Sequence, residues 1–559
     1  MKRRIKYFLI FIMMLMVIPL SSCLFNPVND NNLNLVKKNV ELVNLSNDYD
    51  IKDTNVDIYF YENGNVPLID ISTYYNMLEG FYDNSTRNVS KNTYFNKLYI
   101  SDKSLSLRRV IFDWYHNTVT FKNTLNVCSI HENSNIDFSS YYDLELVKSI
   151  NTLDIEYFLG DYNIDILFYN DLVLMPITFI NFMNNTYYNV TYNGDKLYGF
   201  YYGDDFSVVK NNNTFTELKE DVKVETKNEL LFLLNEKYGL KEYANVEDYY
   251  EYIGEDMWND FVNGNSDTRD DFYFEVIDNM LNDPHSTVSV RDFSYYSNYP
   301  NNGKKYALNE GRYSNIGDTF KLLTDYRNQS EKAESPILFK ENTLFITFDE
   351  FIIGQKNNVY DENGKYKSDA YLIDTPALFY KALTDAKENH PEVENVVIDV
   401  SINGGGYIAA MYKILSFMSN DIYTGYAVSE TEYEVYKILG DTNMDEIYDE
   451  DESFGRFNYY ILESGGTFSA ANALACHAKY NKVAKTIGKR SGGGMCAVMP
   501  YILTDGTRFN LSDKNAQIAI INDNGNYKKQ EIESGAPVDI PLEYSDFYNL
   551  DKILELINA

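Results

Sequence analysis

Three segments place serine, asparagine and glycine residues at points where predicted strands end. Ser469 would open a helix directly after such a strand, in the positive field of the helix start. Asn403 and Gly404–Gly406 follow a buried strand, and glycine lets backbone N–H groups approach a ligand closely. An activated serine hydroxyl beside free N–H donors can attack a carbonyl carbon and stabilise the resulting oxyanion. The segments are VVIDVSINGGGY (396–407), ESGGTFSAANALA (463–475) and IGKRSGGGMC (487–496).

These segments, with two others, resemble the tail-specific (C-terminal processing) protease family, peptidase family S41. The family pattern contains an Asp-x-His-Ser/Thr motif and a strand that ends in Asp-x-x-x-Asn-x-Gly-Gly. A Thr-x-Ser-Ala turn, an Ile-Gly pair before a glycine-rich loop and a Glu-x-Gly-x-x-x-Asp segment follow. The resemblance covers roughly residues 270–550. The matching residues here are Asp283–Ser286, Asp399–Gly406, Thr467–Ala470, Ile487–Gly488 and Glu533–Asp539.

The resemblance implies a C-terminal α/β catalytic domain of crotonase-like fold and a serine-type peptidase activity. It makes Ser469 the nucleophile. The N–H of Ala470 and one from the glycine loop, Gly404 or Gly405, would form the oxyanion hole. The alternative is that Ser469 only caps its helix, as serine commonly does.

The base is where the sequence departs from the family. The Ser–Lys branch has a lysine 25 residues after the serine, and that position is Gly494. Lys489 is a shifted alternative. The tricorn-like branch instead uses a histidine from an earlier segment, which His285 matches, so His285 is the preferred base; a structural histidine in a turn is the alternative.

The other four histidines are poorer candidates. His477 is eight residues after Ser469 on the same helix, about 12 Å along its axis. His390 precedes a proline in a polar loop, and His116 and His131 lie in the N-terminal region.

A base histidine needs an orienting partner. By the resemblance, Glu533 would serve a network with His285; a solvated loop carboxylate is the alternative. Asp283 is interpreted as a turn residue. The family's glutamate three residues after the serine is Asn472 here, which alters that contact.

The 559 residues suggest several domains. Residues 46–220 are predicted to be a β-rich, α+β region with two weak repeats, because Val56–Tyr61 resembles Ile164–Tyr169. Residues 221–335 read as a helical bridge that carries the histidine motif. In residues 336–559, predicted strands alternate with helices, which indicates a parallel sheet covered by helices. The predicted strands and helices there are LFITFDEF, DTPALFYKALTDAKEN, VENVVIDV, YIAAMYKILSFM, FNYYILES, SAANALACHAKY and VAKTIG.

The N-terminus has the layout of a bacterial lipoprotein signal. Residues 1–22 combine a basic start with an apolar run and end at Leu20-Ser21-Ser22, before Cys23. We expect lipidation of Cys23, a flexible tether over residues 23–45 and anchoring at the outer face of the cytoplasmic membrane. An ordinary signal peptide with a chance cysteine is the alternative. The other cysteines, Cys128, Cys476 and Cys496, are free or include one pair.

Composition limits the partners. The net charge of −34 argues against nucleic acid as a partner. No segment has the spacing of zinc ligands, and no cofactor is expected. Peptide processing is the leading interpretation; an inactive peptide-binding relative and a surface adhesin built on residues 46–220 are the alternatives. An acidic insertion has the spacing of a calcium loop but lacks its glycine, so a solvated loop is preferred to calcium. Its oxygen donors would be Asp441, Asn443, Asp445, Asp449 and Glu452.

Overall fold

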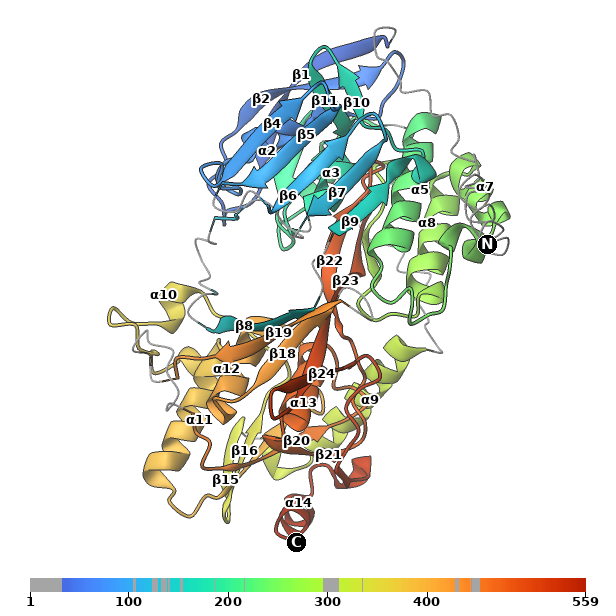
Figure 1. Ribbon diagram of the computed structural model, residues 1–559. Helices are drawn as coiled ribbons and strands as arrows, with labels where there is room; N and C mark the ends of the chain where they lie inside the picture. The colour runs from blue at the N-terminus through green and yellow to red at the C-terminus, as the bar shows by residue number, and fades with distance from the viewer. Residues whose placement is uncertain are drawn as a thin grey trace, which may run out of the picture.

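The structure is a computed structural model with two lobes joined by a narrow waist (Figure 1). The signal segment, Cys23, Cys128 and most of the acidic insertion lie outside the residues that it describes. Cys476 and Cys496 are buried free thiols. The described residues are 33–103, 107–122, 129–131, 138, 141–150, 154–184, 186–215, 217–294, 311–333, 335–427, 432–442, 444 and 453–559.

The N-terminal lobe contains two sheets that share one aromatic-rich core. The larger sheet has the order β10-β11-β3-β2-β1-β13-β12. Its strands are β1 (Leu35–Asn44), β2 (Thr54–Tyr61), β3 (Leu68–Asp70), β10 (Leu167–Tyr169), β11 (Leu172–Pro176), β12 (Asn189–Tyr192) and β13 (Leu197–Phe200). The antiparallel smaller sheet comprises β4 (Arg87–Asn92), β5 (Lys97–Asp102), β6 (Arg109–Asp113), β7 (Thr118–Lys122) and β9 (Asp154–Phe158).

Strand β1 corrects the prediction of a flexible tether over residues 23–45. Its Val40 and Leu42 are buried while the intervening residues face outward, which is the alternation of a half-buried strand. The asparagine-rich stretch before it concealed this pattern. Both repeat segments lead through a second strand into a helix, and the second strands, β3 and β11, pair with each other.

The N-terminal lobe also contains helices, of which α5, α7 and α8 lie beside the sheets and α2 and α3 lie among the strands (Figure 1). They are α2 (Ile71–Met77), α3 (Ile177–Asn184), α4 (Ser207–Asn211), α5 (Glu220–Phe232), α6 (Tyr249–Ile253), α7 (Glu255–Asn263) and α8 (Ser266–Tyr273). The π-helical turns Leu233–Lys237 and Phe274–Met280 continue α5 and α8, and 3₁₀ turns occur at Leu159–Tyr162, Glu331–Ala333, Ala370–Leu372 and Tyr544–Asp546.

The C-terminal lobe is built on a sheet of order β15-β16-β17-β20-β21-β25, in which all neighbours from β16 onward are parallel. Alternate side chains of its strands pack against α11, α12 and α13 on one face and against α9 and α14 on the other. The strands are β15 (Ile337–Lys340), β16 (Thr343–Thr347), β17 (Asn395–Asp399), β20 (Asn458–Glu463), β21 (Ala484–Gly488) and β25 (Ile540–Pro541). The helices are α9 (Arg312–Arg327), α10 (Lys356–Val359), α11 (Thr375–Asn389), α12 (Ile408–Met418), α13 (Ala470–Tyr480) and α14 (Leu550–Ile557).

A further sheet joins the lobes, with the order β14-β23-β18-β19-β8 and with β22 and β24 also paired to β23. The long strand β23 passes through the waist and so connects the two lobes (Figure 1). The chain leaves β7 in the N-terminal lobe, contributes β8 to this sheet and returns to β9, the neighbour of β7. The strands are β8 (Asp143–Ile150), β14 (Thr287–Val290), β18 (Tyr423–Ala427), β19 (Tyr433–Leu439), β22 (Cys496–Ile502), β23 (Arg508–Asp523) and β24 (Asn526–Gln530).

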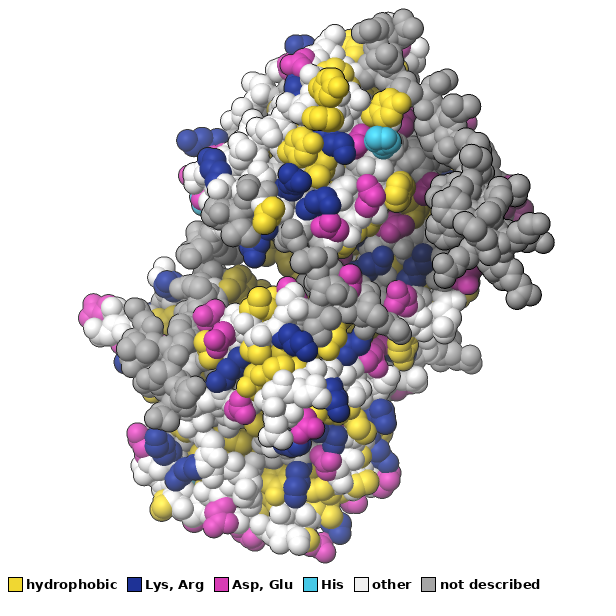
Figure 2. All heavy atoms as spheres, in the orientation of Figure 1, with side chains coloured by type: hydrophobic (Ala, Val, Ile, Leu, Met, Phe, Trp, Pro, Cys, Tyr) yellow, Lys and Arg dark blue, Asp and Glu magenta, His cyan; other side chains and the backbone are white. Residues whose placement is uncertain are grey.

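Acidic and basic side chains are intermixed over the face of the molecule in Figure 2. The described side chains on that face therefore form no single acidic patch. Among the described residues, no helix combines the length and the apolar character that crossing a membrane requires.

Candidate active site

Ser469 occupies the turn between β20 and α13. Its backbone has φ 56° and ψ −123°, a strained conformation for a residue other than glycine. Its N–H donates to the carbonyl oxygen of Gly493 at 2.9 Å. Within the described chain, its side chain makes no capping hydrogen bond to α13. The half-buried hydroxyl is therefore held at a fixed place without serving the helix as a cap.

The glycine loop after β17 lies directly against this serine. A Cβ atom on Gly405 would be 2.7 Å from the Cβ of Ser469 and 3.1 Å from both its Oγ and the amide nitrogen of Ala470. Gly405 has φ +116°, and its N–H donates to Oδ1 of Asn403 at 2.8 Å. The predicted loop therefore reaches the predicted nucleophile, although the Gly405 amide already has a partner. At residue 405, any side chain larger than a hydrogen atom would therefore collide with Ser469.

Buried polar contacts fix where that loop begins. Asp399, at the end of β17, pairs with Nζ of Lys332 at 2.7 Å, and both side chains are buried. The lysine keeps the pKa of Asp399 low in spite of its burial. Nδ2 of Asn403 donates to the carbonyl oxygen of Phe348, and the N–H of Phe468 donates to the carbonyl oxygen of Asn403. The segments that follow β17 and β20 are thereby held together.

The loop after β21 closes the other side of the serine and explains the missing lysine. Gly494 has φ +93°, and a Cβ atom there would be 2.8 Å from ring atoms of Phe468 and 2.9 Å from the amide nitrogen of Ser469. With Phe468 in this position, no lysine can extend from residue 494. Lys489, the shifted alternative, instead forms a half-exposed ion pair with Glu543 at 2.7 Å.

His285 is buried against the ring of Phe468. It is only 8% exposed, and the centroids of its ring and of the Phe468 ring are 4.7 Å apart. Burial lowers the pKa of His285, and Arg312 lowers it further while Asp283 opposes the shift. Burial and Arg312 therefore favour the neutral imidazole, the form that can accept a proton. Among the described residues, neither ring nitrogen has a hydrogen-bond partner.

Asp283 is a turn residue, as expected from the sequence. Its Oδ1 accepts from the N–H of His285 at 3.1 Å and its Oδ2 from the hydroxyl of Ser286 at 2.7 Å. The turn leads directly into β14, which pairs with β23. The carboxylate therefore orients the backbone of His285 and not its ring.

Glu533 forms an ion pair with Arg312, and its role in a network with His285 stays a prediction. Its Oε1 is 2.5 Å from Nη1 of Arg312, and its Oε2 accepts from the amides of Gly494 and Met495 at 3.1 and 2.8 Å. Burial raises the pKa of Glu533, and Arg312 and the amide of Met495 oppose the shift. The carboxylate thus anchors the third glycine loop.

Arg312 is a residue of the site that sequence reasoning missed. It begins α9, donates from Nη2 to the carbonyl oxygen of Gly492 at 3.0 Å, and lies over the Phe468 ring at 5.9 Å. No motif surrounds it in the sequence. Farther along α9, Phe320 packs against the positions of Gly404 and Gly466. One helix therefore contacts three of the loops around Ser469.

The remaining candidates lie elsewhere. Asn472, on α13, donates to the carbonyl oxygen of Ile532 and accepts from the hydroxyl of Ser491 at 2.8 Å, so it binds loops together below the serine. His477 is fully buried, which lowers its pKa to about 4. His390 stacks on Phe339. Of the calcium-loop residues, Asn443, Asp445, Asp449 and Glu452 lie outside the described residues, and Asp441 is buried.

The chain shares a segment with a known family. Residues 353–533 match peptidase family S41. The S41 segment contains Ser469, the three glycine loops and Glu533, whereas His285 and Arg312 precede it. No curated protein matches the sequence.

Several solved structures are similar to parts of the chain. The photosystem II D1 C-terminal processing protease is 18% identical over 36% of this chain and 42% of its own length, with a TM-score of 0.25. A lipoprotein from Streptococcus agalactiae is 13% identical over 60% of this chain and 95% of its own, with a TM-score of 0.35. The tricorn protease is 17% identical over 42% of this chain and 19% of its own, with a TM-score of 0.23.

Proposed function

We propose that this chain is a serine peptidase in which Ser469 is the nucleophile and His285 the general base. The observation that carries the proposal is the contact between the buried, neutral imidazole and Phe468, the residue adjoining the strained serine. The match of residues 353–533 to family S41 supports the same reaction class. A base histidine replaces the lysine for which Gly494 leaves no room.

In the proposed reaction, Oγ of Ser469 bonds to the carbonyl carbon of a peptide while its proton passes to a ring nitrogen of His285. The N–H of Ala470, at the start of α13, donates to the oxyanion. The Gly405 N–H can add a second bond only by leaving Asn403. When the C–N bond breaks, the imidazolium gives its proton to the leaving amine. Water, deprotonated by the same imidazole, then attacks the acyl carbon, and the imidazolium returns its proton to Oγ of Ser469 as the bond between that oxygen and the acyl carbon breaks.

Glu533 and Arg312 would act as positioning residues. The pair holds the loop at Gly492 and Gly494, and that loop accepts the Ser469 N–H. The positive charge of Arg312 also favours the neutral form of His285. Neither side chain transfers a proton in the proposed reaction.

The alternative function is peptide binding without cleavage. One observation favours it: within the described part of the chain no acceptor orients the ring of His285, whereas a base histidine ordinarily has one. A substrate group or a rotation of the ring on peptide binding would have to supply the missing contact.

A fluorophosphonate probe separates the two functions, because it labels only an activated serine. We expect labelling of the wild type and of Ser419→Ala, a control on the helix-terminal Ser419 of the same lobe, but not of Ser469→Ala. Labelling lost in Ser469→Ala together with cleavage of an unfolded protein such as casein supports the peptidase. Failure of the folded wild type to react overturns it and leaves the peptide-binding function.

We also propose that the protein is exported and carries a lipid on Cys23. The support is the basic and apolar leader that ends at this cysteine. Mass spectrometry of the mature N-terminus should show diacylglycerol on Cys23 in the wild type, and Cys23→Ser should be released from the membrane fraction. A mature protein that begins elsewhere and carries no lipid would contradict this.

A further inference from the structure

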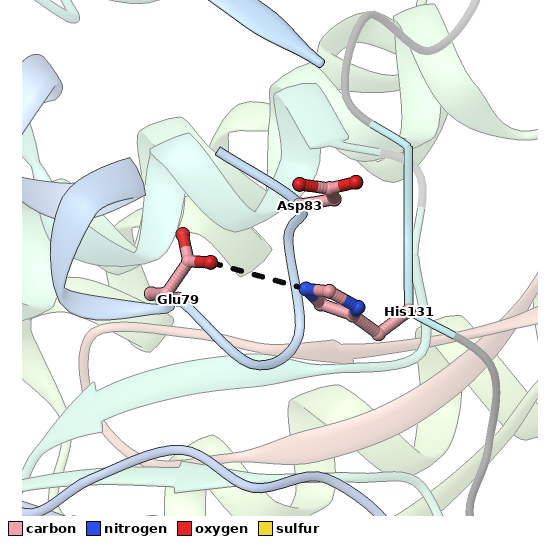
Figure 3. Close-up of side chains that lie close together, drawn as sticks. All are labelled: Glu79, Asp83 and His131. Carbon is pink, nitrogen blue, oxygen red and sulfur yellow. Dashed lines mark ion pairs between the residues drawn. The ribbon is translucent and has the colours of Figure 1, made fainter. Parts of the chain in front are cut away.

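Glu79, Asp83 and His131 point toward one another in the N-terminal lobe (Figure 3). Each offers one ligand atom, and these atoms all lie within 4.8 Å of one another. Nε2 of His131 is 3.9 Å from Oε1 of Glu79. The set mixes an imidazole with two carboxylates, so it differs from an ordinary acidic cluster.

Two separate chain segments are locked together to form this cluster. The N–H of Asp83 donates to the carbonyl oxygen of Ser129, and the N–H of His131 donates to that of Phe81, both at 2.9 Å. Tyr82 and Ile130 form the antiparallel bridge between them. The backbones that carry the three side chains are therefore fixed relative to one another before any ligand arrives.

One oxygen of each carboxylate is already bonded and orients its group. Glu79 Oε2 accepts from the N–H of Asn84 at 3.2 Å, and Asp83 Oδ1 accepts from the N–H of Ser85 at 2.8 Å. A metal ligand oriented by such a contact loses less freedom on binding. The other oxygen of Glu79, Oε1, faces Nε2 of His131.

Solvent reaches the cluster through a neighbouring cavity. Glu79 and His131 line a cavity of about 840 Å³, together with Asp48 and Asp50. The side chains of Glu79 and His131 are 54% and 43% exposed. The three carboxylates around the cavity outnumber its one lysine, Lys52, and so attract cations, and its volume leaves room for water ligands.

We propose that Glu79, Asp83 and His131 bind a zinc ion, with water from the cavity as the fourth ligand. Ligands of tetrahedral zinc at 2.0–2.2 Å lie about 3.4 Å apart, so these donors need to approach by only about 1.4 Å at most. Rotations of exposed side chains can supply that movement. Imidazole favours zinc over calcium or magnesium, which prefer oxygen ligands.

The zinc would fasten the connection between the lobes. Residues 129–131 lie on the stretch that leaves β7 for β8, and β8 belongs to the sheet that joins the lobes. A metal bridge would tie this outgoing stretch to the turn after α2. The proposal does not depend on the peptidase activity.

Isothermal titration of the purified, metal-free protein with zinc chloride tests the proposal. We expect one equivalent of zinc to bind, and we expect His131→Ala and Glu79→Gln each to weaken binding at least about tenfold. His116→Ala is the matched control, because this exposed histidine of the same lobe contacts Asp113 and lies outside the cluster. Calcium chloride in excess should not compete.

Hydrogen exchange locates the bound zinc. Zinc should slow exchange of the amides of residues 79–84 and 129–131 in the wild type but not in His131→Ala. An unchanged affinity in both cluster variants, several equivalents that respond to neither variant, or no binding at millimolar zinc would each overturn the proposal.

Discussion

The two sides of the candidate active site are held in different ways. On the nucleophile side, backbone hydrogen bonds link the ends of β17, β20 and β21, and the serine itself donates to Gly493. On the base side, His285 and Arg312 arrive from segments before the S41 match and contact the serine turn through the ring of Phe468. Hydrogen bonds fix the nucleophile, whereas packing places the base.

Because of this difference, we expect the two sides to tolerate different substitutions. Backbone hydrogen bonds do not depend on the identity of the side chain, except where glycine is required. On the nucleophile side, we therefore expect few substitutions to lower activity, but those few to abolish it. A packed imidazole without a hydrogen-bond partner can move when its neighbours change. On the base side, we therefore expect substitutions to lower activity gradually.

Removal of the nucleophile should have the largest effect. We expect Ser469→Ala to lower peptidase activity by about 10⁴-fold or more, because no other group on the nucleophile side can form the acyl intermediate. Its melting temperature should stay near that of the wild type, since the hydroxyl makes no cap bond. Turnover that survives the substitution would remove Ser469 from the mechanism.

Removal of the base should have the next largest effect. The rate constant of fluorophosphonate labelling should fall about 10²- to 10⁴-fold in His285→Ala, the usual contribution of a general base. His390→Ala, whose ring stacks on Phe339 in a polar loop, is the control and should react at the wild-type rate. Equal rates in both variants would break the comparison, because the base would then lie elsewhere.

A methyl group on the nucleophile side tests whether backbone geometry controls that side. Gly405→Ala should lower the labelling rate about 100-fold, since its Cβ would displace Ser469 and even a 1 Å misplacement is costly. Gly525→Ala is the control, because that glycine also has positive φ but has open space around its Cβ position. If both variants react alike, backbone strain and not contact with the serine governs the effect.

The ion pair between Arg312 and Glu533 should affect stability more than rate. Arg312→Gln leaves a buried carboxylate without its cation and should cost about 1–3 kcal/mol of unfolding free energy, less than a fully buried pair because Arg312 is 27% exposed. The double variant Arg312→Gln/Glu533→Gln should recover part of this loss in denaturant titrations. A double variant less stable than either single one would contradict this.

The smallest effect concerns pH. Burial and Arg312 favour the neutral imidazole, so the labelling rate should reach half its maximum below pH 6.5, the ordinary pKa of histidine. Protonation of His285 removes the acceptor as the pH falls through its lowered pKa. Arg312→Gln should move this midpoint upward. A midpoint above pH 6.5 would show that the active imidazole is not the buried one.

The helices and strands around Ser469 could be predicted from the sequence because the information that specifies them is local. The predicted strands and helices from LFITFDEF to VAKTIG correspond to β16, α11, β17, α12, β20, α13 and β21. Strand ends in one parallel sheet meet at the same edge, so order along the chain predicted their proximity. The glycine pattern marked the places where backbones approach closely.

The base side could not be predicted to the same depth, because long-range packing creates it. Arg312 carries no motif, and the exclusion of lysine at Gly494 depends on a ring that the sequence does not place. The contact of Glu533 with Arg312 could not be foreseen for the same reason. The cluster of Glu79, Asp83 and His131 was also missed, because its members become neighbours only through the bridge between Tyr82 and Ile130.

Strand β23 makes the spacing of the site sensitive to chain length. Its Asn510 pairs with Thr287, two residues after His285, and its Ala519 pairs with Thr424 and belongs to the core that surrounds α13. The nine steps between them span about 30 Å of extended chain. A single residue inserted there would lengthen this part of β23 by about 3.3 Å. It would also turn the following side chains to the opposite face of the sheet. The distance between the candidate base and the helix of the candidate nucleophile therefore depends partly on the number of residues in β23.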